Sequence, residues 1–322
     1  MAEEGTQWDR PPVSLNELLK LSLKLSENEM KEYKSDFTEM DPDRRKFLDD
    51  AMKSVMENTE TKMLIEFVEA MRKRAKDITS LKLEDNELEE LSNQFEDSAL
   101  IMDHIDHAKD FVKMGGMPLA VEFLKCPYSS LQWRSAEVIA VSTQNNPFVQ
   151  AAALTTPAIP TLMHILDTTD VDIVAVKCLH ALSQIVGNYK PGETLFLKLG
   201  GLQTIVNRLW SPVLKLKLKA AFMIRKLIGA NENDSVIPSL VKARLHVVLI
   251  QTLKQNVDDV HDTLLWILFT MASESKEVVL ECRRPDYGFK RLISDRRETL
   301  DRETYEEALE TYGSLYELCF SN

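Results

Sequence analysis

Apolar residues recur along the chain in short helical patterns at a nearly constant interval. Four segments begin with a turn residue or a small residue and continue with apolar positions at helical spacing: GMPLAVEFL, AIPTLMHIL, GLQTIVNRL and RLHVVLIQTL. They start at Gly116, Ala158, Gly201 and Arg244, which are 42, 43 and 43 residues apart. A weaker copy, GFKRLI, begins 44 residues later at Gly288. The pattern predicts a repeating helical unit of about 43 residues.

Each segment is followed by a connector and a second amphipathic stretch. These stretches are WRSAEVIAVSTQN, VAVKCLHALSQIVGN, LKLKAAFMIRKLIGAN and HDTLLWILFTMAS, and the first three end at Asn145, Asn188 and Asn231. Asparagine, like glycine, tolerates the left-handed backbone conformation that ends many helices. We therefore interpret these asparagines as helix C-termini, and a ladder of functional asparagines is the alternative.

A period of 40 to 47 residues with two or three helices per unit is typical of armadillo and HEAT repeats. One such unit cannot bury its apolar face alone, so neighbouring units must stack. We predict an all-α, right-handed, armadillo-like solenoid of about four repeats with helical caps at both ends. The last helix of each unit should line the concave, partner-binding surface. The expected divisions are a flexible segment over 1–38, a helical cap over 39–107, the repeats over 108–280 and a second helical cap over 281–322.

Charge is distributed unevenly along this chain of 322 residues, whose formal net charge is -12. The first 107 residues hold 15 Lys and Arg against 27 Asp and Glu, so this part alone carries a net charge of -12. Residues 176–254 hold 12 cations against three acids, a net charge of +9. A block of this kind can steer a partner of opposite sign.

One cationic residue recurs in the second stretch of each of three repeats. Arg134, Lys177 and Lys219 are spaced 43 and 42 residues apart. Such a ladder suits an acidic protein surface, whereas a nucleic-acid backbone would need many more positive contacts and stacking aromatic rings. We therefore expect a protein partner and no nucleic acid, and merely solvated lysines are the alternative.

The segment VLKLKLKAAF alternates like a strand, but the apolar stripe that follows it predicts a helix from Leu216 to Ile228. On that helix Lys215, Lys219 and Lys226 fall within about 40° of one line, at 100° per residue. Lys217 points nearly opposite. The alternation is therefore interpreted as coincidental.

No phosphate loop, GxGxxG, HExxH or nucleophile elbow is present in the sequence. The segment DHIDH places His104 and His107 on neighbouring helical turns, where they could reach one metal ion. A solvated helix face is the favoured interpretation, and a metal-dependent enzyme the rival one. We expect no catalytic residues, no metal and no cofactor.

The four cysteines form no CxxC pair, which favours a reducing compartment. The N-terminus MAEEGTQWDR lacks the features of a secretory signal, and the longest strongly apolar run, LLWILFTMA, is too short to cross a bilayer. We expect a monomer in the cytoplasm, with the nucleus as an alternative, and neither secretion, nor the endoplasmic reticulum, nor membrane attachment.

Five segments together carry a resemblance to a known family: DHAKDFVKMGGMPLAVEFL, LQWRSAEVIAVSTQNN, FLKLGGL, LKLKLKAAF and ECRRPDYG. From about residue 41 to its C-terminus the chain resembles the cytosolic armadillo-type nucleotide exchange factors of the 70-kDa heat-shock chaperone, the Hsp-binding-protein/Fes type. The resemblance implies a co-chaperone without enzymatic activity. Its concave face would grip the chaperone's ATPase domain, displace one lobe and let ADP escape. A generic armadillo adaptor without exchange activity is the alternative.

The resemblance also implies residues that contact the chaperone. The strongest candidates are Ala108, in the DHAKDF segment, and Lys219, although His107 departs from the family's usual Asn before that Ala. Further candidates, placed by the repeat phase and by the line of lysines, are Arg134, Gln144, Asn145, Lys177, Lys215 and Lys226. The segment PPVSLNELLKLSLKLS resembles the family's release segment, in which Leu18, Leu19, Leu21 and Leu23 would occupy the chaperone's substrate groove.

Overall fold

The computed structural model describes residues 41–46, 60–229, 236–255 and 257–321. It divides the chain into two units, Met1–Glu57 and Asn58–Asn322. In the first unit, residues 42–46 are helical. The predicted flexible segment over 1–38, with its four leucines, lies outside the described residues.

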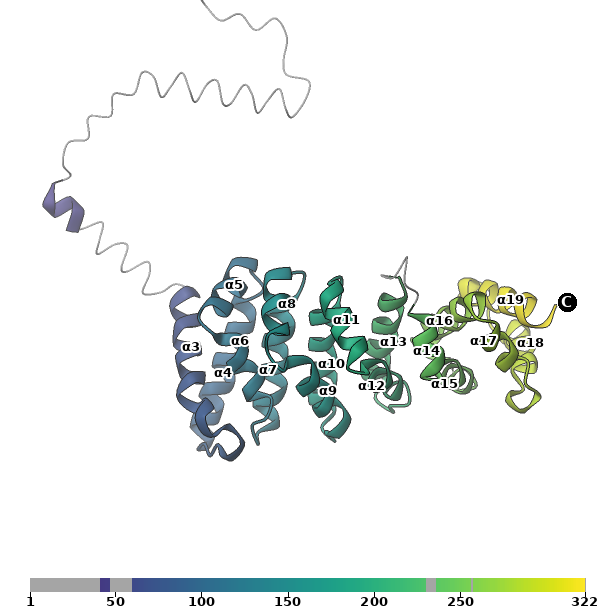
Figure 1. The fold of residues 1–322 in the computed structure, drawn as a ribbon, viewed down its shortest axis with the longest axis horizontal. Coiled ribbons are helices and arrows are strands. Elements are labelled where there is room, and N and C mark those ends of the chain that lie inside the picture. The colour runs from purple at the N-terminus through teal and green to yellow at the C-terminus, as the bar shows by residue number, and fades with distance from the viewer. Residues whose placement is uncertain (1–40, 47–59, 230–235, 256, 322) are drawn as a thin grey trace, which may run out of the picture. The chain divides into compact units, whose positions relative to one another are not determined.

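The described part of the second unit is built from helices, and Figure 1 shows them stacked in chain order from α3 to α19. This confirms the predicted all-α, armadillo-like solenoid. The unit begins with α3 (Glu60–Arg74), the 3-10 helix η1 (Ala75–Ser80) and α4 (Asp85–Ile101). These elements lie where the helical N-terminal cap was predicted.

Groups of three helices follow, each with a short first helix, a second helix and a longer third helix. The first helices are α5 (Ile105–Lys113), α8 (Pro147–Leu154), α11 (Lys190–Lys198), α14 (Ile237–Lys242) and α17 (Lys276–Cys282). The second helices are α6 (Gly116–Phe123), α9 (Ala158–Thr168), α12 (Gly201–Arg208), α15 (Leu245–Thr252) and α18 (Phe289–Thr299), the last preceded by the 3-10 helix η2 (Pro285–Tyr287). The third helices are α7 (Ser129–Thr143), α10 (Asp172–Val186), α13 (Leu214–Gly229), α16 (His261–Glu274) and α19 (Glu306–Phe320).

The described residues contain four three-helix units and, where the C-terminal cap was predicted, a further group of three helices, α17, α18 and α19. The predicted boundaries after residues 107 and 280 fall inside α5 and α17. The first helices, which are only 6 to 9 residues long, lie between the end of one amphipathic stretch and the start of the next repeat's segment, where no helix was predicted. Such short helices have too few apolar positions to show a helical period.

The third helices form a row in which each packs on the next. Starting from α4, contacts run through α7, α10, α13 and α16 to α19. We call these helices the third-helix row. One continuous apolar core runs along it, and side chains such as Ile139, Leu182, Ile224 and Leu268 are fully buried there. No single helix in the described ranges is long and apolar enough to cross a membrane; Pro147–Leu154 and Ala158–Thr168 meet that test only as a pair bent by 76°.

The asparagines end third helices as predicted. Asn145 follows α7 with φ of 50°, and Asn188 follows α10 with φ of 56°. Both angles lie in the left-handed region, which asparagine enters more readily than most residues. Asn231 lies outside the described residues.

The sequences FVKMGG and FLKLGG form the same turn between the first and second helices of two three-helix units. We call this turn the corner of a unit. In each, the first glycine, Gly115 or Gly200, has φ near 80° and precedes the second helix. At the second glycine a methyl group would overlap the ring of the phenylalanine five residues earlier, Phe111 beside Gly116 and Phe196 beside Gly201. Each corner therefore needs a left-handed glycine and then a residue without a side chain.

Gly201→Ala tests this packing. The added methyl group must push the buried Phe196 ring aside, so the free energy of unfolding should fall by about 1–3 kcal/mol. The matched control is Gly313→Ala in α19, where no heavy atom lies within 4 Å of the added methyl group. Alanine in a helix interior should raise the free energy of unfolding by about 0.5–1 kcal/mol. Denaturant titration followed by circular dichroism measures both, and a Gly201→Ala protein as stable as the control would contradict the packing.

Candidate partner-binding surface

Charged side chains of neighbouring third helices meet on one surface of the second unit. Cations that the sequence predicts one per repeat lie on α7, α10 and α13. Ion pairs with acids of the preceding helix join α4 to α7 and α7 to α10, and the charges of Glu137 and Lys177 act on Lys219 of α13. The structure thus brings Arg134, Lys177 and Lys219 onto adjacent helices of the third-helix row.

Arg134 on α7 is held within the fold. Its guanidinium lies 4.1 Å from the centre of the Trp133 ring. Its Nη2 atom lies 3.5 Å from a carboxylate oxygen of Glu96 on α4, and Nη1 donates to the carbonyl oxygen of Ser130 at 3.2 Å. The side chain is therefore oriented by stacking and hydrogen bonding before any partner arrives.

Lys177 on α10 is paired with an acid of the preceding third helix. Its Nζ atom lies 2.7 Å from Oε2 of Glu137 on α7, and Nδ1 of His180 lies 3.6 Å from the same oxygen. The nearby imidazole of His180 is the largest cause that lowers the pKa of Glu137, Lys177 lowers it further, and partial burial opposes both. The pKa falls from 4.5 to about 2, so Glu137 stays a carboxylate that neutralises Lys177.

The lysines of α13 have no such acid. Among the described residues no ion pair joins Lys215 or Lys219 to a carboxylate, whereas Lys217 lies 3.2 Å from Asp258 on the opposite side. That pairing agrees with the predicted direction of Lys217. Partial burial is the largest cause that lowers the pKa of Lys219, followed by the positive charge of Lys215, and the charge of Glu137 opposes both.

The repeat phase explains the missing acid. Glu96 faces Arg134, and Glu137 faces Lys177. One repeat further on, 43 residues after Glu137, the chain carries His180 instead of an acid. The third-helix row is thus neutralised internally at α7 and α10 and remains cationic at α13.

Ala108 does not lie on an accessible surface. The side chain is 1% exposed and belongs to the apolar core beneath α5. The protein's own side chains cover this methyl group, and its contact with a partner stays a prediction. A large residue at this position would disrupt folding before it could report on binding.

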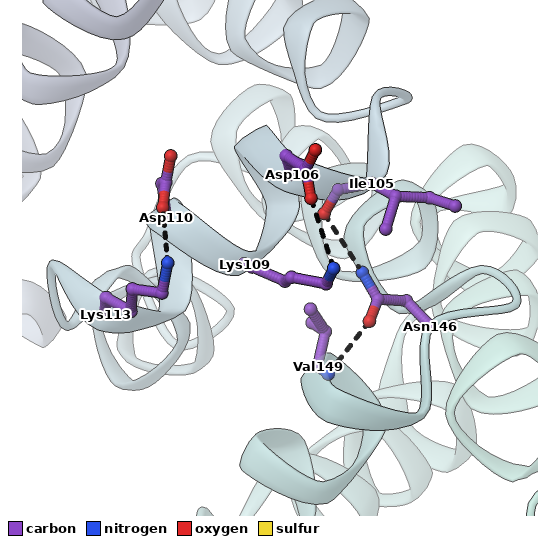
Figure 2. A network of polar contacts seen from close by, with 7 residues as sticks. All are labelled: Ile105, Asp106, Lys109, Asp110, Lys113, Asn146 and Val149. Atoms are coloured by element: carbon purple, nitrogen blue, oxygen red, sulfur yellow. Dashed lines mark hydrogen bonds and ion pairs between the residues drawn. The ribbon is translucent and has the colours of Figure 1, made fainter. Parts of the chain in front are cut away.

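The charged side chains of α5 form ion pairs within the helix, and its first turn is tied to the next unit. Figure 2 shows Lys109 paired with Asp106 at 3.1 Å and Lys113 paired with Asp110 at 2.8 Å. The Asn146 amide donates to the carbonyl oxygen of Ile105 at 3.3 Å, and its oxygen accepts from the backbone nitrogen of Val149 at 3.4 Å. Asn146 thus ties the start of α5 to the start of α8.

The remaining predicted residues lie near the ends of third helices. Gln144 and Asn145 are exposed after α7, and Lys226 is half-buried near the end of α13, where its Nζ atom packs against Gly187. In the DHIDH segment, Nε2 of His107 lies 2.8 Å from a carboxylate oxygen of Glu60, and the two histidine rings are 5.3 Å apart. In the part of the chain that the structure describes, no group of three or more potential ligands could hold a metal ion.

The sequence pattern did not indicate several members of this surface. Trp133 lies beneath the cations of two helices, Arg134 at 4.1 Å and Lys177 at 5.7 Å. Glu137 neutralises Lys177, and Phe222 on α13 is 54% exposed between the lysines. Comparing Glu137, His180 and Phe222, which lie 43 and 42 residues apart, would have shown that α13 differs from the helices before it.

Comparisons with known proteins agree with this architecture. The SIL1/FES1/HPBP1 C-terminal domain model matches residues 107–257. Hsp70-binding protein 1 of Mus musculus is 29% identical over 325 residues, covering 97% of this chain and 87% of that protein. A designed armadillo repeat protein has a TM-score of 0.61 at 15% identity, covering 80% of this chain and all of that one. The structural likeness concerns the fold alone.

Shorter matches reach two further kinds of relative. The Hsp70 nucleotide exchange factor FES1 of Mycosarcoma maydis is 28% identical over 135 residues, 42% of this chain and 34% of that protein. The nucleotide exchange factor SIL1 of Xenopus laevis is 33% identical over 103 residues, 32% of this chain and 23% of that protein.

These relatives contradict the predicted cytoplasmic location. They include SIL1, an exchange factor of the endoplasmic reticulum, besides FES1 proteins of the cytosol. The matched SIL1 segment is no less identical to the chain than the FES1 segment, so the similarity does not select the cytosolic branch. The exclusion of the endoplasmic reticulum was wrong because it rested on the ends of the chain, which do not decide the compartment.

Glu137→Gln tests the internal neutralisation of the third-helix row. The folded state holds the pKa of Glu137 below its ordinary value, so the carboxylate stabilises the fold fully above about pH 4.5 and less as the pH falls towards 2. At pH 7 the substitution should lower the free energy of unfolding by about 1–2 kcal/mol, a value reduced for solvent screening. At pH 3 the difference from wild type should shrink to less than about half.

The control is Glu96→Gln, because this carboxylate is 63% exposed and lies 3.5 Å from its cation. An exposed pair of this kind should contribute less than about 0.5 kcal/mol. Denaturant titrations at both pH values measure the effects. A Glu137→Gln difference of equal size at pH 7 and pH 3 would show that the carboxylate is not stabilised as described.

Proposed function

Because the chain belongs to the SIL1/FES1/HPBP1 family, we propose that it is a co-chaperone, a nucleotide exchange factor that binds a 70-kDa heat-shock chaperone and promotes release of its ADP. The observation that carries the proposal is the family match over residues 107–257, which includes the third helices α7, α10 and α13. The relatives bear the names of Hsp70-binding proteins and Hsp70 nucleotide exchange factors.

The proposed contact is between the third-helix row, as the concave face, and the chaperone's ATPase domain. The cations of α13 support this assignment, because Lys215 and Lys219 have no acidic partner in the described residues. Lys219 is already partly desolvated, so less hydration remains to be lost when a carboxylate of the partner approaches. Lys177 and Arg134, paired with Glu137 and Glu96, contribute orientation and shape rather than net charge.

The mechanism needs no catalytic group on this chain. A factor that binds the displaced, nucleotide-free arrangement of the two lobes more tightly than the closed one shifts the chaperone towards that arrangement. By linkage, nucleotide affinity falls by the same factor, about 5- to 150-fold for a typical coupling. ADP leaves, ATP rebinds, and the exchange factor dissociates. The chaperone alone performs the hydrolysis, and one copy of this chain acts on one chaperone.

Release of a fluorescent ADP analogue from the purified chaperone tests the proposal. Stopped-flow measurement should show that the wild-type protein accelerates release, because its binding weakens the nucleotide complex. A protein that binds the chaperone without changing the release rate would be the generic armadillo adaptor instead. A protein that does not bind the chaperone at all would contradict the proposed function entirely.

The same assay tests the role of Lys219. Lys219→Glu should weaken chaperone binding by about 2–5 kcal/mol if a desolvated carboxylate faces the lysine, and acceleration should be lost at the same protein concentration. The matched control is Lys198→Glu, an exposed lysine at the end of α11 in the same unit. Equal effects of the two charge reversals would indicate that only net charge matters.

The N-terminal segment is proposed to assist client release. Leu18, Leu19, Leu21 and Leu23 would occupy the chaperone's peptide-binding groove and prevent a released client from rebinding. Replacing all four by Ser in the full chain should leave ADP release unchanged and slow the release of a labelled client peptide. The two rates, measured side by side, separate this role from the exchange activity. An unchanged rate of client release in the Ser variant would contradict the proposed role of the four leucines.

A further inference from the structure

One aromatic side chain lies on the same face of α13 as the unpaired lysines. Phe222 is 54% exposed, although its neighbours Ala221 and Met223 are buried. At 100° per residue, Lys215, Lys219, Phe222 and Lys226 fall within about 60° of one another. We call these four residues the α13 stripe. It presents a phenyl ring with a lysine on either side along the helix.

The equivalent position in the two preceding units carries a polar residue. Glu137 on α7 and His180 on α10 lie 3.6 Å apart and belong to one internal network. In α13 the same position holds a ring that is half exposed to solvent, and Lys219 has no acid opposite it because His180 stands at that place on α10. An apolar ring and unpaired cations therefore occur together at this point of the third-helix row.

Exposure of an apolar ring is not a signal by itself, since single apolar residues are common on surfaces. Phe148 on α8 is 49% exposed and Trp210 after α12 is 50% exposed, but neither lies on a third helix. What distinguishes Phe222 is its position between cations without acidic partners in the described residues. Aromatic side chains within a rim of charged residues are the usual centres of protein interfaces.

We propose that Phe222 is the anchor of the chaperone interface, inserting its ring into an apolar pocket of an acidic protein surface while Lys215 and Lys219 pair with carboxylates at the rim. The inference rests on the proposed function and deepens it by naming the chemistry of the partner's surface. A rise of 1.5 Å per residue places Phe222 about 4.5 Å beyond Lys219 and about 10 Å beyond Lys215 along the helix axis. The partner must therefore offer carboxylates on one side of the pocket at those offsets.

The ring and the lysines support each other physically. Insertion of the ring removes water from the adjacent lysine, and a lysine–carboxylate pair is stronger where the surroundings are less polar. A nucleic acid is disfavoured because its backbone would need many more positive contacts than this stripe offers, and only one ring is available for stacking. An acidic protein surface with an apolar pocket could bind both the exposed ring and the unpaired lysines of the α13 stripe.

The first test compares two phenylalanines of similar exposure. The dissociation constant of the full-length protein for the ADP-bound 70-kDa chaperone is measured for wild type, Phe222→Ala and the control Phe148→Ala. Phe222→Ala should weaken binding by about 30-fold or more, as expected for a central aromatic contact, and Phe148→Ala by less than about threefold. Phe222→Leu should recover part of the affinity because it restores apolar surface.

Salt dependence separates the ring from the lysines. Phe222→Ala should leave the slope of affinity against salt concentration unchanged, whereas Lys219→Gln should reduce it. Circular dichroism and thermal melting check that each variant is folded. We expect an intact fold because the Phe222 side chain is exposed. A reduced salt slope in Phe222→Ala would mean that the ring acts only by orienting the lysines, and would contradict insertion.

Fluorescence reports insertion directly. Binding should shift the emission of a Phe222→Trp protein to shorter wavelength, relative to wild type, because the indole leaves water, and a Phe148→Trp protein should show no such shift. If the wild-type protein does not bind the chaperone, the proposed exchange-factor function itself is contradicted. If wild type binds and accelerates ADP release, but Phe222→Ala binds like Phe148→Ala, the function stands and the anchor is wrong.

Discussion

The structure depends on burial of an apolar face that no single three-helix unit can cover alone. Each third helix packs on the one before and the one after, so that α10, for example, lies between α7 and α13. In a stack of this kind the free energy of unfolding is approximately the sum of the stabilities of the units and the energies of the interfaces between neighbours. It also requires that polar groups at the unit ends find partners, since a buried group without one is costly. Asn146 and Gln150 meet this requirement with their side-chain amides, and Gln150 donates to the carbonyl oxygens of Gln184 and Gly187 at 2.8 and 3.0 Å.

Stacking also decides what charge the third-helix row presents. Side chains of adjacent third helices come close enough to pair, so an acid on one helix cancels a cation on the next. Glu96 with Arg134 and Glu137 with Lys177 follow this rule, and α13 departs from it because His180 replaces the acid. A chain with a formal net charge of -12 thus keeps a small cationic stretch on α13 of the third-helix row. Its position, rather than the overall charge, is what a partner of opposite sign would recognise.

An exchange factor of the proposed kind must hold its contacts in fixed relative positions, because only a rigid surface can favour one arrangement of a partner's lobes over another. The corners of the units provide such rigidity. Gly116 and Gly201 leave room for the rings of Phe111 and Phe196, and the left-handed residues Gly115 and Gly200 set the direction of the following helix. The side chains that carry charge are themselves held, as Arg134 is by Trp133 and Glu96. Binding would then cost little ordering of the factor itself.

The sequence by itself determined the helical repeat, its interval, the start of each second helix and the left-handed asparagines at 145 and 188, because these follow from local periodicity and backbone preference. It also placed Lys217 opposite Lys215 and Lys219, since helical geometry alone decides which residues share a face. Only the tertiary structure decided which cations are free, that Ala108 is buried, and that a short helix opens every unit. The reason is that pairing and burial depend on residues about 40 positions away, such as Glu137 beside Lys177, and one helix's own pattern holds no record of them.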